Sequence, residues 1–221
     1  MRTFYFPLRL IISALILFWF NPVLSQKSTA MKEASQDLLR FKKFTYVDQQ
    51  GTGLEAFSFL MPSGWMFEGG MTWLLDVPMM PSVSAFRVYN PKGKEEFEVF
   101  PNHCFYWTTN LQQLALFPPG SRYFGSTVKQ QVTAQKALRE IILPEQRRGY
   151  QGLTVLKDEN VPDLPLALGA GKQAQGPVTS GATGAKLRIR YTREGIPMEE
   201  EFSAVVETII FPTQSMYGTI Y

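Results

Sequence analysis

The chain has 221 residues, enough for one ordinary domain, and its 45% hydrophobic and 19% charged residues exclude a disordered or fibrous protein. A formal net charge of +3 is too small for a dedicated nucleic-acid binder. A single cysteine excludes an internal disulfide framework and a multi-cysteine zinc site, and a single histidine excludes any site that needs two.

The first 25 residues are predicted to be a signal peptide. Arg2 and Arg9 form a short basic region, and residues 10–20 are apolar apart from Ser13. A helix of this length covers about 17 Å, less than the roughly 30 Å hydrocarbon core of a bilayer. We therefore expect cleavage after Ser25, a mature chain of net charge +1 without a membrane span, and a periplasmic or extracellular location. A permanent N-terminal anchor is the alternative.

The mature chain is divided into a spacer, one domain and a tail. Residues 26–43 are predicted to be a polar spacer with a short helix, since only Leu38, Leu39 and Phe41 form an apolar stripe. A single α+β domain is expected over residues 44–211. Residues 212–221 are interpreted as a tail or as the start of a truncated strand, because their apolar end has no terminating turn.

A series of short strands is predicted in the first half of the domain. Aromatic and β-branched runs separated by Gly, Pro, Asn and Asp are typical of strands and turns. These runs are residues 44–47, 55–61, 65–67, 71–75, 83–89 and 95–100. Gly69 and Gly70 are predicted to form a bend or bulge. Strands so close in sequence indicate an antiparallel meander.

One main helix is predicted between Thr127 and Pro144. Thr127 and Gln130 have capping-box spacing, and apolar residues recur near the helical period as far as Ile142. Pro144 is expected to end the helix. A strand is predicted at 153–156.

Residues 159–184 form a Gly/Pro-rich excursion that is predicted to be mobile. Within it, one helical turn is expected after Asp163, and Gly169 is expected to stop that turn.

A β-hairpin is predicted over residues 187–206, centred on Glu194 and Gly195. Its register pairs Arg190 with Glu199 and Arg188 with Glu201, two cross-strand pairs of opposite charge.

Two glutamate runs are the candidate acid–base residues, Glu95, Glu96 and Glu98 in the first and residues 199–201 in the second. Glu96 and Glu98 share a strand face about 7 Å apart, which suits glycoside hydrolysis. Such pairs also occur on solvated strand faces. An exported carboxylate-dependent hydrolase is therefore kept as an alternative function.

Three other motifs are interpreted as structural. Adjacent residues of an extended segment point to opposite faces, so His103 cannot act as the base that activates Cys104 as a nucleophile. We expect Cys104 to be a buried packing residue. Arg147 and Arg148 are predicted to lie in a solvated loop. The pattern at 169–174 fits a loose dinucleotide fingerprint but lacks the flanking strand and helix. We predict no catalytic residue, no metal and no cofactor.

An aromatic group is the candidate binding surface, with Trp73, Tyr89, Phe105, Tyr106 and Trp107 as its members. Core and rim packing is the alternative interpretation. An exposed aromatic patch would suit an unknown protein partner or a small apolar ligand.

The run from Phe57 to Trp65, Phe-Ser-Phe-Leu-Met-Pro-Ser-Gly-Trp, resembles the opening of PsbP/Mog1-type domains, where an aromatic strand runs into a Pro-x-x-Trp turn. The order of strands, helix, strand and terminal hairpin is also similar between residues 44 and 206. The resemblance implies a central antiparallel sheet covered by helices and a non-enzymatic accessory or binding role. A related interpretation is that the chain belongs to an uncharacterised bacterial secreted family of this fold. The resemblance identifies no functional residue in this chain.

The expected fold is α+β, with a central antiparallel sheet of six or seven strands and one main helix packed on it. The expected function is that of an exported, non-enzymatic binding or accessory module whose partner is an unknown protein or a small apolar ligand. Besides the hydrolase, the alternative is the N-terminal domain of a longer envelope protein.

Overall fold

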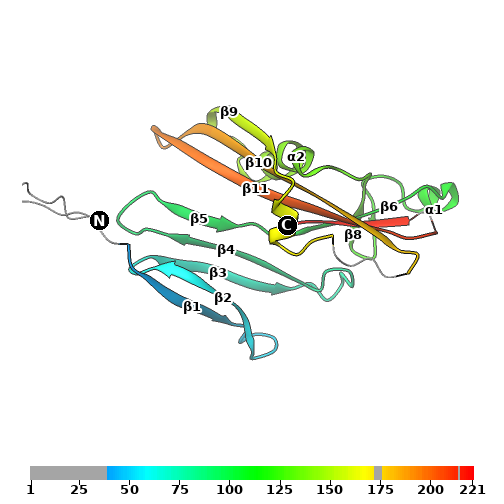
Figure 1. Cartoon of the computed structure of the whole chain (residues 1–221), viewed down its shortest axis with the longest axis horizontal. Helices are drawn as coiled ribbons and strands as arrows, with labels where there is room; N and C mark the ends of the chain where they lie inside the picture. Colours follow the sequence, from blue (N-terminus) through cyan, green and yellow to red (C-terminus); the bar gives the residue numbers. More distant parts are fainter. Residues whose placement is uncertain (1–38, 172–175, 214) are drawn as a thin grey trace, which may run out of the picture. The chain divides into compact units, whose positions relative to one another are not determined.

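The computed structural model describes residues 39–171, 176–213 and 215–221. Over these residues the chain is rich in strands, which form a seven-stranded mixed sheet and two smaller sheets, with a few short helices (Figure 1). The predicted signal peptide and residues 26–38 of the predicted spacer lie outside the described residues. The end of the spacer, residues 41–43, begins a strand instead of completing a helix.

The two smaller sheets contain the strands predicted in the first half of the domain. One sheet is a hairpin of two antiparallel strands, and the other is an antiparallel meander of three. The strands are β1 (Phe41–Val47), β2 (Glu55–Pro62), β3 (Met66–Trp73), β4 (Ser82–Tyr89) and β5 (Glu96–Val99). Local alternation of apolar residues located these strands, except that the predicted strands 65–67 and 71–75 are one continuous strand, β3.

Aromatic rings pack the β1–β2 hairpin against β3 and β4. The ring of Phe44 stacks on that of Phe67 with centroids 4.4 Å apart, and Phe57 stacks on Phe86 at 4.9 Å. Such ring pairs add stabilisation beyond the apolar area that they bury.

Of the predicted bend or bulge at Gly69 and Gly70, the bulge is wrong. The β3–β4 register runs through both glycines without a shift. A Cβ atom at Gly70 would lie 2.3 Å from the hydroxyl oxygen of Tyr46, and one at Gly69 would lie 2.4 Å from the carbonyl oxygen of Ala85. The glycines thus allow close packing, Gly69 against the neighbouring strand β4 and Gly70 against Tyr46 of β1.

The large sheet has the strand order β7-β8-β6-β12-β11-β10-β9, and all its pairings are antiparallel except that of β6 with β8. The sheet has seven strands, but it is mixed, and it does not contain the strands predicted in residues 44–100, which form the two smaller sheets as β1–β5. Its strands are β6 (His103–Thr108), β7 (Arg122–Tyr123), β8 (Ser126–Val128), β9 (Gln151–Asn160), β10 (Thr179–Arg193), β11 (Ile196–Ile210) and β12 (Ser215–Ile220). The predicted tail thus contributes β12, between β6 and β11.

The β10–β11 hairpin has the predicted register. Nη2 of Arg190 lies 2.6 Å from Oε1 of Glu199, as the cross-strand pairing requires. Glu201 is opposite Arg188 in the ladder, but its carboxylate binds Nζ of Lys186 at 2.8 Å. The second predicted ion pair is therefore replaced by a diagonal one.

The Arg190–Glu199 pair predicts a pH dependence. The hydrogen bond from Arg190 holds the pKa of the Glu199 carboxyl below its usual range. A folded-state pKa lowered in this way contributes stability above the unfolded-state pKa, and that contribution is lost as the pH falls through the folded-state value. We expect carboxyl NMR titration to give Glu199 a depressed midpoint that returns toward the usual range in Arg190→Gln. An unchanged midpoint in this variant would show that the pair has no influence.

The main helical stretch runs from Ala134 to Gln146. It comprises α2 (Ala134–Ala137), a π-helical turn η1 (Leu138–Ile142) and α3 (Leu143–Gln146), and the hydroxyl of Thr133 accepts a hydrogen bond from the Lys136 N–H at its start.

Both predicted ends of the helix are wrong. Thr127 lies in β8, where its segment pairs with β6 and β7, so tertiary pairing overrides the local capping signal. Pro144 does not end the helix. In the preceding π turn, the Leu143 N–H donates to the Leu138 carbonyl, so the turn contains one extra residue just before the proline. Proline has no N–H and needs no helical acceptor, so the helix continues past it.

The two faces of the β10–β11 region are both covered. On one face the helical stretch packs its apolar side on the sheet, and the buried cluster there includes Ala134, Ala137, Leu138, Ile142, Leu187, Ile189, Phe202 and Ala204. On the other face lies α4 (Leu164–Ala167), so close that a Cβ atom at Gly184 would be 2.7 Å from Cδ of Pro165.

The predicted excursion at 159–184 is shorter than expected. β9 extends to Asn160 and β10 begins at Thr179, so both flanking strands continue into it. The predicted helical turn is confirmed as α4, and it is followed by Gly169 with a φ of 72°.

Candidate functional site

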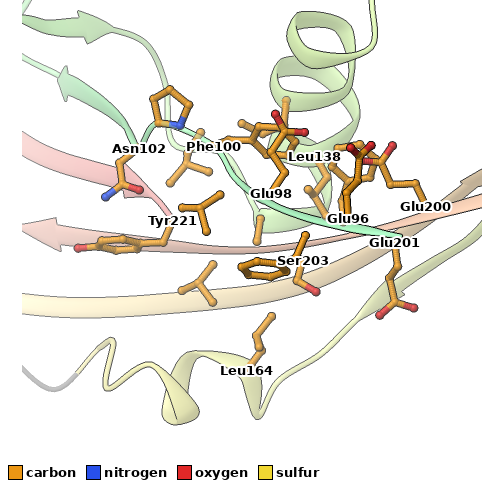
Figure 2. A pocket seen from close by; sticks show the side chains of 18 of the residues that line it. Glu96, Glu98, Phe100, Asn102, Leu138, Leu164, Glu200, Glu201, Ser203 and Tyr221 are labelled. Carbon is orange, nitrogen blue, oxygen red and sulfur yellow. The ribbon is translucent and has the colours of Figure 1, made fainter. Parts of the chain in front are cut away.

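A cavity of about 620 Å³ lies between β5 and β11. One wall is the continuous segment 94–102, and the opposite wall is 198–205 of β11. Apolar side chains line it from both faces of the sheet, with Leu138 and Ile142 from the main helical stretch and Leu164 and Leu168 from the region of α4. Figure 2 shows Leu138 and Leu164 on opposite sides of the cavity.

The structure brings the two glutamate runs together, although each run was considered separately in the sequence. Glu95, Glu96 and Glu98 line the cavity from one side, and residues 199–201 line it from the other. The carboxylates of Glu96, Glu98 and Glu200 gather at one end, and that of Glu201 points away from them (Figure 2).

A buried arginine lies between two of these glutamates. Arg147 is only 8% exposed, and its Nη2 lies 2.9 Å from Oε2 of Glu98. It also donates two hydrogen bonds to Glu200, one of them from Nε at 2.8 Å. The prediction that Arg147 is solvated is therefore wrong. Its two glutamate partners are distant in sequence, so no local pattern indicates them. This contact also explains why a carboxylate lies opposite Ile189 in the hairpin.

Aromatic rings surround the guanidinium of Arg147. Its carbon lies 5.2 Å from the ring centre of Phe100 and 5.4 Å from that of Phe202, and the two rings stack on each other. Burial opposes the charged form of Arg147, but the hydrogen bonds and charges of Glu200 and Glu98 outweigh burial and raise its pKa. The arginine therefore remains a cation in a mostly apolar wall.

Glu96, the third of the glutamates that gather at one end of the cavity, also has an arginine partner. Nη1 of Arg193 lies 2.7 Å from Oε1 of Glu96, and this hydrogen bond raises the pKa of Arg193. Nearby, burial and then the charge of Glu200 raise the pKa of Tyr191 to about 12. The phenol is thus protonated at neutral pH.

The five aromatic residues of the candidate patch do not share one surface. Phe105 and Tyr106 are buried at 3% and 2% exposure. Trp73 and Tyr89 lie at opposite ends of the β3–β4 ladder, where Trp73 donates a hydrogen bond to Asp48 and Arg87 covers the ring of Tyr89. Trp107 is half-buried on β6, in another sheet.

The histidine and the cysteine have separate partners, as the alternation of strand residues predicts. Nε2 of His103 lies 3.3 Å from Oε2 of Glu145, and Sγ of Cys104 lies 3.7 Å from the hydroxyl of Thr219. Burial raises the pKa of the Cys104 thiol, which disfavours the nucleophilic thiolate. Cys104 is half-buried, less enclosed than expected.

Among the described residues, no group of three His, Cys, Asp or Glu side chains could hold a metal ion. In the same ranges, no helix has the length and apolarity needed to cross a membrane. Comparison of the chain with family models, curated proteins and solved structures gives no match.

Proposed function

We propose that this chain is an exported, non-enzymatic binding or accessory module whose binding site is the cavity between β5 and β11. The observation that carries the proposal is an apolar cavity whose inner carboxylates already bind arginines. Concave, mostly apolar sites with a few fixed polar groups are the usual form of ligand sites. An apolar part of a protein partner or of a small ligand fits this lining.

The arginine partners favour binding over catalysis. The oxygens of Glu96, Glu98 and Glu200 are engaged by guanidinium groups of Arg147 and Arg193. Charge-assisted hydrogen bonds of this kind are short and directional, so they fix the carboxylates instead of leaving them open to a substrate. The three glutamates then shape the rim of the site.

The exported hydrolase is the second candidate, and the convergence of the two glutamate runs on one cavity favours it. Glycosidases need two carboxylates that both reach the scissile bond. If the chain hydrolyses a glycoside, Glu98→Gln should abolish the activity without loss of the fold. Failure of a panel of chromogenic glycosides to react with the wild-type chain argues against this candidate.

The export and the fold family belong to the same proposal. The basic and apolar order of residues 1–25 supports cleavage after Ser25, so the exported protein should begin at Gln26 when its N-terminus is sequenced. The run from Phe57 to Trp65 is the feature that supports a PsbP/Mog1-like fold.

A neutral fluorescent probe, N-phenyl-1-naphthylamine, tests the binding site. We expect its fluorescence to rise on binding to the full chain. Ser203→Phe places a ring at the cavity wall and should weaken binding at least about tenfold, or about 1.4 kcal/mol. The matched control Ser58→Phe, at an exposed position of β2, should bind normally. Equal binding by both variants would place the probe elsewhere and contradict the proposed site.

A further inference from the structure

A second cavity, of about 370 Å³, lies between the seven-stranded sheet and the main helical stretch. Its walls are Trp107 of β6, residues 119–120, residues 127–132 in and after β8, and Lys136 and Glu140 of the main helical stretch. We call it the Trp107 groove. It shares no lining residue with the cavity between β5 and β11. Its volume lies in the range of small-molecule sites.

Backbone hydrogen bonds hold the walls of the Trp107 groove in place. The Val128 N–H donates to the Ser121 carbonyl at 2.8 Å, and the Gly120 N–H donates to the Val128 carbonyl at 2.8 Å. The Lys129 N–H donates to the carbonyl of Tyr106 in β6 at 2.9 Å. The groove is therefore preformed, so a ligand does not have to order its walls on binding.

The indole of Trp107 is available to a ligand. Alternation along β6 directs it to the same face as Phe105, which belongs to the buried cluster under the main helical stretch. Trp107 itself is only half-buried. No aromatic ring of the described residues packs on the indole, and no acceptor among them binds its N–H. Trp107 thus offers a ligand an aromatic surface and one hydrogen-bond donor.

Hydrogen-bond donors dominate the rest of the lining. The ammonium of Lys129 forms no ion pair within the described part of the chain. The backbone N–H groups of residues 130–132, which follow it, have no acceptor there either. Glu140 is the single carboxylate of the lining, and its Oε2 lies 3.9 Å from Nζ of Lys136. The lining therefore has a net charge of +1 and several unused donors.

The sequence around the groove is also free of acidic residues. Residues 99–139 contain no Asp or Glu, and this stretch supplies every lining residue except Glu140. Surrounding carboxylates therefore do not neutralise Lys129 from within this stretch. A lone cation, unused N–H donors and an aromatic surface are together complementary to an anion that carries a flat apolar group.

We propose that the Trp107 groove binds a small carboxylate whose ring lies against Trp107 and whose carboxylate group is bound by Lys129 and the N–H groups of residues 130–132. Hydrogen bonds from charged and backbone donors to a carboxylate are short and strong. Aromatic acids and sugar acids share this chemistry. The inference goes beyond the proposed function, because it adds a second site for a ligand of different chemistry.

Two acids and their neutral counterparts are the probes, benzoate with benzamide and D-glucuronate with D-glucose. Each is titrated into the full chain and followed by ¹H–¹⁵N NMR. We expect at least one acid to shift the indole N–H of Trp107 and the amides of residues 129–132. That acid should bind at least about tenfold more tightly than its neutral counterpart, or by about 1.4 kcal/mol. Either acid supports the inference, and the one that binds identifies the source of the carboxylate.

Substitutions test the two halves of the site. Lys129→Gln removes the charge but keeps the backbone hydrogen bond to Tyr106, and it should weaken binding of the acid at least about tenfold. The matched control Lys92→Gln, at an exposed position of the β4–β5 turn, should bind normally. Trp107→Leu removes the aromatic surface and should weaken binding roughly fivefold.

The outcomes separate this inference from the proposed function. Equal binding of the acids and their neutral counterparts overturns it, as does wild-type affinity in Lys129→Gln. Because the two cavities share no lining residue, Lys129→Gln should leave the binding of N-phenyl-1-naphthylamine unchanged. If this dye binds and neither acid does, the proposed function stands and the carboxylate site falls. If an acid binds at the Trp107 groove and the dye does not bind, the carboxylate site stands and the proposed site falls.

Discussion

Replacing Arg147 by methionine is expected to lower the free energy of unfolding by about 3 kcal/mol. The change leaves Glu98 and Glu200 in the cavity wall without their cation, and removing one partner of a buried ion pair costs far more than the pair contributes as a whole. For a domain of this size, the melting temperature should fall by about 6–12 °C. Urea unfolding followed by tryptophan fluorescence measures the change.

Two further variants make the Arg147 result specific. Arg148→Met, at the exposed neighbouring position, should stay within about 0.5 kcal/mol of the wild type. The triple variant Arg147→Met, Glu98→Gln and Glu200→Gln should recover most of the lost stability, since it removes the uncompensated charges. A triple variant as unstable as Arg147→Met would show that packing, not charge, explains the loss.

Phe202→Ala is expected to destabilise the chain by about 3–4 kcal/mol. The ring is 4% exposed, lies in the main buried cluster, and forms part of the cavity wall. Truncating a buried phenylalanine removes its transfer free energy and leaves a cavity. The control Phe97→Ala, at a 58% exposed position of β5, should change stability by less than about 0.5 kcal/mol.

A double-mutant cycle connects the two predictions. Phe202 stacks on Phe100, and the guanidinium of Arg147 lies over both rings. Because the cation and the ring interact, the losses from Phe202→Ala and Arg147→Met should fall short of their sum by about 1 kcal/mol. Additive losses would mean that the cation–ring contacts contribute nothing to stability.

The local elements were predictable because their signals are local. The strands of the two smaller sheets follow from alternating apolar residues, and the β10–β11 hairpin follows from the Glu194-Gly195 turn, where both residues have positive φ. The Arg190–Glu199 pair then follows from the register alone.

The start of the main helix shows where local signals fail. Thr127 has a capping-box pattern that favours a helix there, yet its segment pairs with β6 and β7. The helix begins only after Thr133, where the preceding strand pairing has ended. A weak propensity is overridden when a strand ladder can be completed instead.

The site was only partly predictable. Both glutamate runs are recognisable as candidate residues, but nothing in the sequence shows which cation lies beside Glu200. That cation is Arg147, which is 53 residues away from Glu200 and 49 from Glu98. No spacing rule relates residues at such separations, so their meeting could not be read from the chain.

By itself, the sequence determined the strand-rich α+β class, the terminal hairpin with its register, and the separation of His103 from Cys104. These depend on periodicity and turn chemistry within a few residues. Only the tertiary structure decided that Arg147 meets Glu98 and Glu200, and that residues 94–102 and β11 form opposite walls of one cavity. The cavity depends on contacts between segments about 100 residues apart, and it is this long-range contact that brings the two glutamate runs to one site.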